Sequence, residues 1–207
     1  MKFFESAPPL KTKTALDKIK SKPEFTDFYL SGGTALSLQL GHRESEDLDF
    51  FTSKEFNPEM LQTKLLPLGD ISDATLEKNT LNLFLDGVKI QFLYYPYRML
   101  ENLVPYENIN LSSVIDVACT KLITISARGS KKDFIDLYFL LQTYTLVKLF
   151  ENLDKKYQGV NYNHIHIVKS LTYFDDADAQ PMPRMHQEAD WEEIKKVIIK
   201  KVVGYKI

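Results

Sequence analysis

Residues 29–52 read Tyr-Leu-Ser-Gly-Gly-Thr-Ala-Leu-Ser-Leu-Gln-Leu-Gly-His-Arg-Glu-Ser-Glu-Asp-Leu-Asp-Phe-Phe-Thr. A short apolar run ends in Gly32-Gly33-Thr34, and a segment of helical length follows it. Asp47-Leu48-Asp49 then opens a second apolar run. This order predicts a strand, a helix over residues 34–40 and a second strand over residues 47–52.

The two aspartates are the most informative polar residues in this stretch. Alternate side chains of a strand point to one face, so Asp47 and Asp49 would project together, roughly 7 Å apart. Paired carboxylates beside Phe50 and Phe51 are costly unless a cation lies between them. Oxygen ligands suit Mg²⁺ or Mn²⁺, which predicts a metal site. Alternatively, Asp47 lies in the preceding loop and Asp49 at the surface.

The paired glycines precede the predicted helix. Gly32 and Gly33 offer bare backbone N–H groups at a helix start, where a phosphate can bind. Thr34 would add its hydroxyl or N–H to the terminal phosphates of a nucleotide. The alternatives are a tight turn for the glycines and a helix N-cap for Thr34. The sequence carries no GxGxxG or Walker motif, which disfavours dinucleotide and P-loop sites.

Taken together, these motifs resemble those of the AbiEii/AbiGii toxin nucleotidyltransferases, a branch of the polymerase-β-like nucleotidyltransferase superfamily. The first matching block is quite specific, and two weaker blocks follow it in the expected order. The matching residues are Gly32-Gly33-Thr34-Ala35-Leu36, His42-Arg43-x-Ser45-x-Asp47-Leu48-Asp49-Phe50, Lys132-Asp133-Phe134-Ile135-Asp136-Leu137-Tyr138 and Ser170-Leu171-Thr172-Tyr173-Phe174-Asp175-Asp176-Ala177.

The resemblance implies an Mg²⁺- or Mn²⁺-dependent enzyme that transfers a nucleotidyl group from an NTP to an acceptor hydroxyl. RNA, in particular the tRNA 3′ end, is the implied acceptor. It also implies a toxin of a toxin–antitoxin or phage-defence pair, with a cognate antitoxin as partner. Gln91 stands where the superfamily has a third carboxylate, and we expect it on the sheet face of Asp47 and Asp49. The alternative is therefore a catalytically impaired protein that binds a nucleotide or a partner.

Further candidate site residues are charged. The resemblance implies that Lys121 reaches the triphosphate; alternatively, it extends along an apolar helix stripe to solvent. Arg128 would bind the same anion or cap its helix. Asp136 is expected to hold Lys121 or Arg128 in place, whereas Asp133 fits a capping box with Ser130. Arg43 would contact phosphate or pair with a neighbouring glutamate.

The order of elements predicts an α+β fold, with a small mixed-sheet nucleotidyltransferase core followed by a helical C-terminal half. We expect two domains, over residues 1–110 and 111–207. Asp86-Gly87 between two strand-like runs predicts a hairpin in the first domain. Further strands are expected at 28–30, 71–78, 81–85 and 88–93, a loop at 175–189, and helices at 11–20, 57–66, 113–127, 131–143, 145–157, 163–171 and 190–203.

Composition sets the remaining limits. The chain has 207 residues, of which 44% are hydrophobic, and its formal charge of −2 gives no global basic field for nucleic acid. Cys119 is the single cysteine, so a disulfide within the chain and a cysteine zinc site are excluded. The N-terminal segment does not resemble a signal peptide, and no apolar run reaches membrane-spanning length. We therefore expect a cytoplasmic protein with no membrane partner.

Overall fold

The computed structural model describes residues 2–206 and divides into two compact units. The first unit comprises the residues up to Tyr97 together with Asn102–Ser113, and the second comprises Arg98–Glu101 and the residues from Val114 on. Within the described residues, none of the helices combines the length and the hydropathy needed to cross a bilayer. The two-domain boundary at 110/111 remains a prediction about independent folding.

The first unit is built on a seven-stranded mixed sheet of order β3-β4-β5-β2-β1-β7-β6. β1 pairs in parallel with β7, and β2 pairs in parallel with β5, while the remaining neighbours are antiparallel. The strands are β1 Tyr29–Ser31, β2 Leu48–Thr52, β3 Ile71–Glu77, β4 Thr80–Leu85, β5 Val88–Tyr94, β6 Val104–Tyr106 and β7 Ile109–Leu111.

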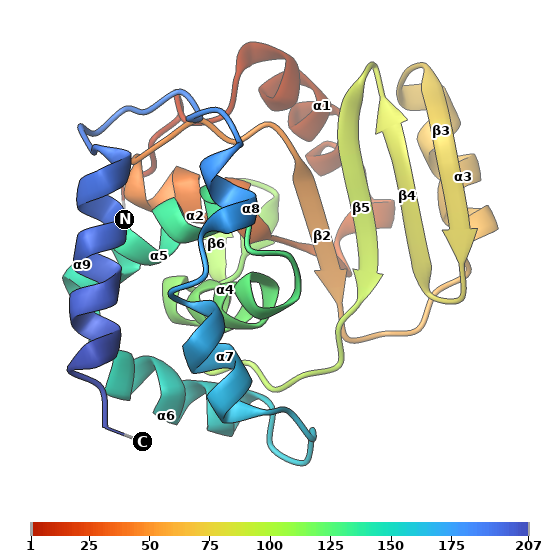
Figure 1. The fold of residues 1–207 in the computed structure, drawn as a ribbon. Coiled ribbons are helices and arrows are strands. Elements are labelled where there is room, and N and C mark those ends of the chain that lie inside the picture. The colour runs from red at the N-terminus through yellow and green to blue at the C-terminus, as the bar shows by residue number, and fades with distance from the viewer. Residues whose placement is uncertain (1, 207) are drawn as a thin grey trace. The chain divides into compact units, whose positions relative to one another are not determined.

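Three α-helices of this unit cover one face of the sheet. They are α1 Leu10–Lys20, α2 Gly32–Leu40 and α3 Pro58–Leu65, and two short 3₁₀ turns lie at Pro23–Phe25 and Leu66–Leu68. Their apolar residues form one core with Leu48, Phe50, Ile90 and Phe92 of the sheet. Figure 1 shows β2, β5, β4 and β3 side by side with α1 and α3 behind them.

Strand alternation decides which side chains lie opposite the helices. On β5, Val88, Ile90 and Phe92 are buried in the core, whereas Lys89, Gln91 and Leu93 are half-buried on the other face. This alternation matches the period-two pattern of the sequence. The face opposite α1 and α3 is therefore the one that carries polar groups.

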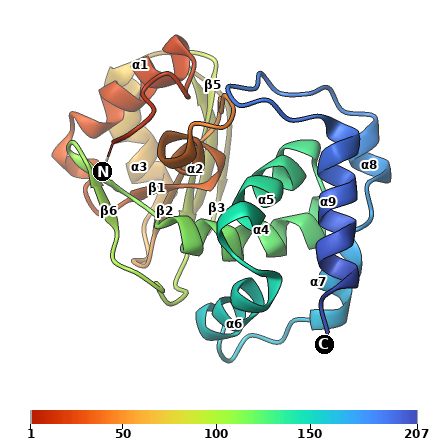
Figure 2. The ribbon, with the colours of Figure 1, turned by 90° about the vertical axis from the view of Figure 1, so that its left-hand side faces the viewer.

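The second unit is helical. Its elements are α4 Val114–Arg128, α5 Lys131–Thr143, α6 Leu146–Lys156, α7 His164–Ser170, α8 Asp175–Asp178 and α9 Trp191–Val203. α4 packs against α5, α6 and α7, and α5 packs against α9. Figure 2 shows this group of helices, with α5 beside α9. Cys119 is completely buried on α4, where it is a small core residue.

The predicted fold class is confirmed, and the local differences have simple causes. β6 and β7 were not expected because three-residue strands are too short to show a period. The predicted 175–189 loop contains the four-residue helix α8. α2 begins at Gly32 instead of Thr34, because a glycine can take the left-handed conformation found there.

Candidate active site

The start of α2 is shaped around a carboxylate of the neighbouring strand. Ser31 and Asp49 are partners across the antiparallel pair β1–β2. Gly32 has a φ of +64°, and a Cβ built on it would lie 2.1 Å from Oδ2 of Asp49. Only glycine accommodates both this backbone and this approach. The structure therefore places the Asp49 carboxylate against the first residue of α2.

The segment before β2, which includes Arg43 and Ser45, packs against the same turn at Gly33. A Cβ on Gly33 would lie 2.8 Å from Nη2 of Arg43 and 3.0 Å from Oγ of Ser45. Arg43 is only 2% exposed, and its Nη1 donates to the carbonyl of Glu44 at 2.8 Å. The hydroxyl of Ser45 is also hydrogen-bonded to the Thr34 hydroxyl, with the two oxygens 2.9 Å apart. Both glycines are thus in close contact with the chain that leads to the aspartates.

Thr34 is buried and faces the protein. Its hydroxyl donates to the main-chain carbonyl of Asp47, and it also forms a hydrogen bond with the hydroxyl of Ser45, which then acts as the donor. The helix N-cap is Ser31, so the alternative of Thr34 as N-cap is wrong. The hydroxyl therefore fixes the main chain at Asp47. The group of Thr34 that can face an anion at the helix start is its backbone N–H.

The polar sheet face forms a row across three strands. Asp49 on β2 is the register partner of Gln91 on β5, and Gln91 is the register partner of Asn82 on β4. Nε2 of Gln91 donates to Oδ1 of Asn82 at 2.6 Å. Asp47 precedes β2 by one residue and is half-buried, as Asp49 is. Asp49, Gln91 and Asn82 thus lie along one face, and Asp47 lies in the segment that leads into it.

This donor set fits a hard divalent cation. Asp47 and Asp49 would supply carboxylate oxygens as ligands. Because Gly32 has no Cβ, the carboxylate of Asp49 has room beside the start of α2. Across residues 2–206, no three His, Cys, Asp or Glu side chains form a group that could hold a metal ion. The candidate site therefore offers two carboxylates, and the neutral amide of Gln91 stands beside Asp49 on the next strand.

The second unit contains a buried ionic cluster. Nζ of Lys121 on α4 lies 2.8 Å from Oδ1 of Asp133 and 2.6 Å from Oδ2 of Asp136, both on α5. The side chains of Lys121, Asp133 and Asp136 are 7%, 1% and 0% exposed, respectively. The alternative in which Lys121 extends its amine to solvent is therefore wrong. Asp136 holds Lys121 as expected, and Asp133 does so too.

Asp133 is the centre of this cluster. Oδ2 of Asp133 accepts from Ser130 Oγ at 2.6 Å and from Arg128 Nε at 3.2 Å. Burial alone would raise the pKa of Asp133, but the charges of Lys121 and Arg128, with the hydrogen bonds from Lys121 and Ser130, outweigh it and lower the pKa. Ser130 is the N-cap of α5 and Asp133 lies in its first turn, as the capping pattern predicts, but the capping-box bonds are not formed, because Ser130 Oγ donates to the Asp133 carboxylate.

The sequence contains a signal for Asp133 that the capping pattern obscured. Asp133 and Asp136 are three residues apart, which places both carboxylates on one face of α5. Lys121 lies on the preceding helix with few other polar residues around it. Two acids at this spacing after a lysine on an apolar helix indicate a shared ionic cluster. Arg128 differs from the other members, because its side chain is 65% exposed.

A mixed sheet with Asp47 and Asp49 beside a Gly-Gly helix start is the arrangement expected of a nucleotidyltransferase, and similarity to known proteins places the chain in that class. Residues 14–81, which hold both glycines and both aspartates, match the model of the family described as "Nucleotidyl transferase AbiEii toxin, Type IV TA system". A second match is a relative in Aquifex aeolicus (strain VF5), the uncharacterized protein aq_aa25. It is 39% identical over 201 residues, which cover 93% of this chain and 95% of the relative. The chain belongs to the nucleotidyl transferase AbiEii toxin family.

Solved structures agree in fold. JHP933 from Helicobacter pylori is 20% identical with a TM-score of 0.53, covering 94% of this chain and 93% of that one. MenT4, a nucleotidyltransferase toxin from Mycobacterium tuberculosis H37Rv, is 14% identical with a TM-score of 0.54, covering 96% of this chain and 87% of that one. At these identities the likeness concerns the fold.

Proposed function

We propose that this chain is a Mg²⁺-dependent enzyme that transfers a nucleotidyl group from an NTP to a hydroxyl of RNA, with the tRNA 3′ end as acceptor. The observation that carries the proposal is the carboxylate of Asp49 against Gly32 at the start of α2. This contact brings a candidate metal ligand next to a candidate phosphate site. Both are needed at one point for nucleotidyl transfer.

The start of α2 is the proposed site for the phosphates of the NTP. The N–H groups of Gly33 and Thr34 belong to the first turn, whose partial positive charge favours an anion. Arg43 is buried behind Gly33, so we propose that it acts by fixing this turn and makes no direct contact with phosphate. Thr34 likewise acts through its N–H, since its hydroxyl is bonded within the protein.

Asp47 and Asp49 are the proposed ligands of the divalent ion, Mg²⁺ or Mn²⁺. When bound, such an ion neutralises charge on the phosphates and lowers the pKa of a coordinated hydroxyl. Asp49 is held by its strand and by Gly32, and Asp47 by the bond from Thr34 to its carbonyl. These contacts fix the main chain at Asp47 and the carboxylate of Asp49 before any ligand arrives, and such preorganisation is a main contribution of a protein to catalysis.

The Lys121–Asp133–Asp136 cluster is proposed to position charge in the second unit. Lys121 is held by two carboxylates, so its positive charge is largely balanced within the cluster. Arg128 has one bond to Asp133 and an exposed guanidinium, so it is the member best able to meet a phosphate. We propose that Asp133 and Asp136 orient Lys121 and Arg128, the candidate anion-binding residues of this unit.

The experiment is a transfer assay with each of the four α-³²P-labelled NTPs, Mg²⁺ and total tRNA. The full-length protein should label RNA with at least one NTP, and a chelator should abolish the label. Asp49→Ala is the matched inactive variant. The absence of label on RNA with every NTP would overturn the proposed acceptor. For toxin activity, expression of the wild-type protein should stop bacterial growth, whereas expression of Asp49→Ala should not. Co-expression of a cognate antitoxin should restore growth.

A further inference from the structure

A pocket of about 330 Å³ lies beside Asp47, between α1 and the β4–β5 hairpin. This volume falls within the range of small-ligand sites, roughly 300–1,000 Å³. Its lining includes Lys11 from α1, Phe84 from β4 and Lys89 from β5. An aromatic ring and two ammonium groups therefore border one of the proposed metal ligands.

Phe84 and Lys89 are presented by the sheet. They are register partners across the β4–β5 hairpin, two residues along each strand from the Asn82–Gln91 pair. They therefore lie on the polar sheet face, which also carries Asp49. Phe84 is half-buried, so its ring is partly accessible. A ring of this kind can stack on a nucleobase, and a lysine next to it can bind the adjacent phosphate.

The opposite wall of the pocket is held by α1. The hydroxyl of Thr12 donates to the carbonyl of Glu46 at 2.9 Å, which ties α1 to the segment that enters β2. Nζ of Lys11 lies 2.5 Å from the position of a Cβ on Gly87, so the glycine makes room for the lysine. The lining also includes the carboxylates of Glu46 and Asp47. A cation bound at Asp47 would leave the lining net positive.

The pocket is distinct from the start of α2. The lining found among residues 2–206 shares Asp47 with the proposed metal site but includes neither Asp49 nor Gly32, Gly33 and Thr34. A transfer reaction needs two substrates on either side of the metal ligands. If the phosphates of the NTP lie at the helix start, the pocket on the hairpin side is the place for the other substrate.

We propose that this pocket binds the 3′-terminal nucleotide of a single-stranded RNA acceptor. Phe84 stacks on the terminal base, and Lys11 and Lys89 bind the flanking phosphates. The proposal rests on the proposed function, because it assigns the second substrate of that reaction. It adds residues outside the Gly-Gly-Thr and Asp-x-Asp motifs to the site.

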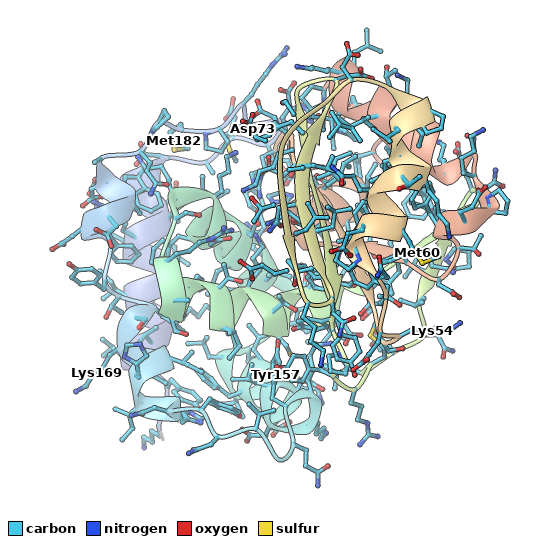
Figure 3. All side chains as sticks on the ribbon, turned by 90° about the vertical axis from the view of Figure 1, so that its right-hand side faces the viewer. Lys54, Met60, Asp73, Tyr157, Lys169 and Met182 are labelled. Carbon is cyan, nitrogen blue, oxygen red and sulfur yellow. The ribbon has the colours of Figure 1, made fainter. Side chains whose placement is uncertain are left out.

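The test measures how a short fluorescein-labelled single-stranded RNA binds to the full chain. Binding is measured by fluorescence anisotropy in the absence of NTP. Phe84→Ala should weaken RNA binding about tenfold, the size expected for one lost stack. Phe84→Tyr should bind as the wild type does, and Lys89→Glu should bind more weakly. Lys54→Glu is the control for charge, because Lys54 projects from the surface of the same unit, 68% exposed (Figure 3). The affinity for NTP should stay the same in all four variants.

Crosslinking gives a measurement on the unaltered protein. RNA that ends in 4-thiouridine should crosslink to a peptide within residues 81–93 of the wild type. Three results would overturn the inference. The wild type fails to bind the RNA, Phe84→Ala and Lys89→Glu bind it as well as the wild type does, or the crosslink lies outside residues 81–93. A drop in NTP affinity for Phe84→Ala with unchanged RNA binding would also overturn it, because the pocket would then hold the donor.

The inference and the proposed function can fail separately. If the wild type transfers a nucleotide to RNA, and Phe84→Ala binds RNA and transfers as well as the wild type does, the proposed function is supported and the pocket assignment is overturned. A crosslink at residues 81–93 without transfer by the wild type would support the pocket and overturn the function. Circular dichroism on each variant verifies that the compared proteins are folded.

Discussion

Asp49 and Gln91 are register partners on the adjacent parallel strands β2 and β5, so their side chains leave the same face of the sheet. The prediction that Gln91 lies on the sheet face of Asp47 and Asp49 is thereby confirmed for Asp49, whereas Asp47 precedes the strand. Nε2 of Gln91 donates to Oδ1 of Asn82 at 2.6 Å, which gives the half-buried amide a partner on the neighbouring strand. The position next to Asp49 is thus occupied by a neutral donor and acceptor in place of a third carboxylate.

Gln91→Asp should strengthen the binding of a divalent ion. A third carboxylate adds negative charge beside Asp49, and the amide of Asn82 can still donate to it. We expect Mn²⁺ affinity, measured by calorimetry, to rise about tenfold or more. Asn82→Asp, one strand further from Asp49, is the matched control and should change the affinity less. Equal effects of the two substitutions would argue against a site at Asp49.

Asp49→Ala should abolish transfer while the protein stays folded. The substitution removes a proposed metal ligand, and the loss should exceed the roughly 10- to 100-fold loss that is typical for groups which only orient a ligand. Stability without metal should change little, because one of two neighbouring carboxylates is removed. Transfer rates and thermal unfolding with and without Mg²⁺ measure both effects. Retained transfer would rule out Asp49 as a metal ligand.

Gly32→Ala separates backbone strain from the contact with Asp49. Gly32 and Gly159 both have positive φ, +64° and +83°, but nothing lies within 4 Å of a Cβ on Gly159. Each alanine should cost about 1–2 kcal/mol of unfolding free energy for the left-handed backbone. Only Gly32→Ala should also displace the carboxylate of Asp49 and lower Mn²⁺ affinity and transfer. The same binding in both variants would mean that the Gly32–Asp49 approach has no functional role.

The first unit was predictable because its signals are local. The change from a helical to a two-residue period located β4 and β5, and the Asp86-Gly87 turn fixed their pairing. Parity then placed Gln91 correctly. The roles of Thr34 and Arg43 within the turn could not be read in this way, because both depend on burial against residues 11 and 10 positions away, respectively.

The ionic cluster of the second unit depends on contacts between helices, which no local pattern encodes. Lys121 and Asp136 are 15 residues apart in the sequence, and their meeting requires α4 and α5 to pack together. Two interpretations of Lys121 fit the sequence, and only the helix packing excludes the one in which its amine reaches solvent. The local pattern Ser130-x-x-Asp133 predicts a helix start and is silent about the contact of Asp133 with Lys121, which depends on the packing of α4 against α5.

Lys121→Met tests whether the cluster serves only stability. The substitution leaves two buried carboxylates without their shared cation, and should cost about 3–5 kcal/mol. Lys156→Met is the matched control, because Lys156 and Asp116 form another buried pair, 2.6 Å apart and each 1% exposed. Both variants should be destabilised, and only Lys121→Met should lower NTP affinity, as measured by calorimetry under conditions where both are folded. Unchanged affinity in Lys121→Met would make the cluster purely structural.

The lowered pKa of Asp133 makes a distinct prediction about pH. Because the folded state binds the proton of Asp133 less readily than the unfolded chain does, this carboxylate stabilises the fold most above its unfolded pKa of about 3.9. That contribution should be lost as the pH falls below 4 and through the folded pKa. Asp133→Asn lacks the titrating group, so the difference in unfolding free energy between wild type and variant should shrink on acidification. Urea unfolding of both proteins from neutral pH to pH 3 measures this difference, and a value independent of pH would contradict an ionised Asp133 bonded to Lys121 and Arg128.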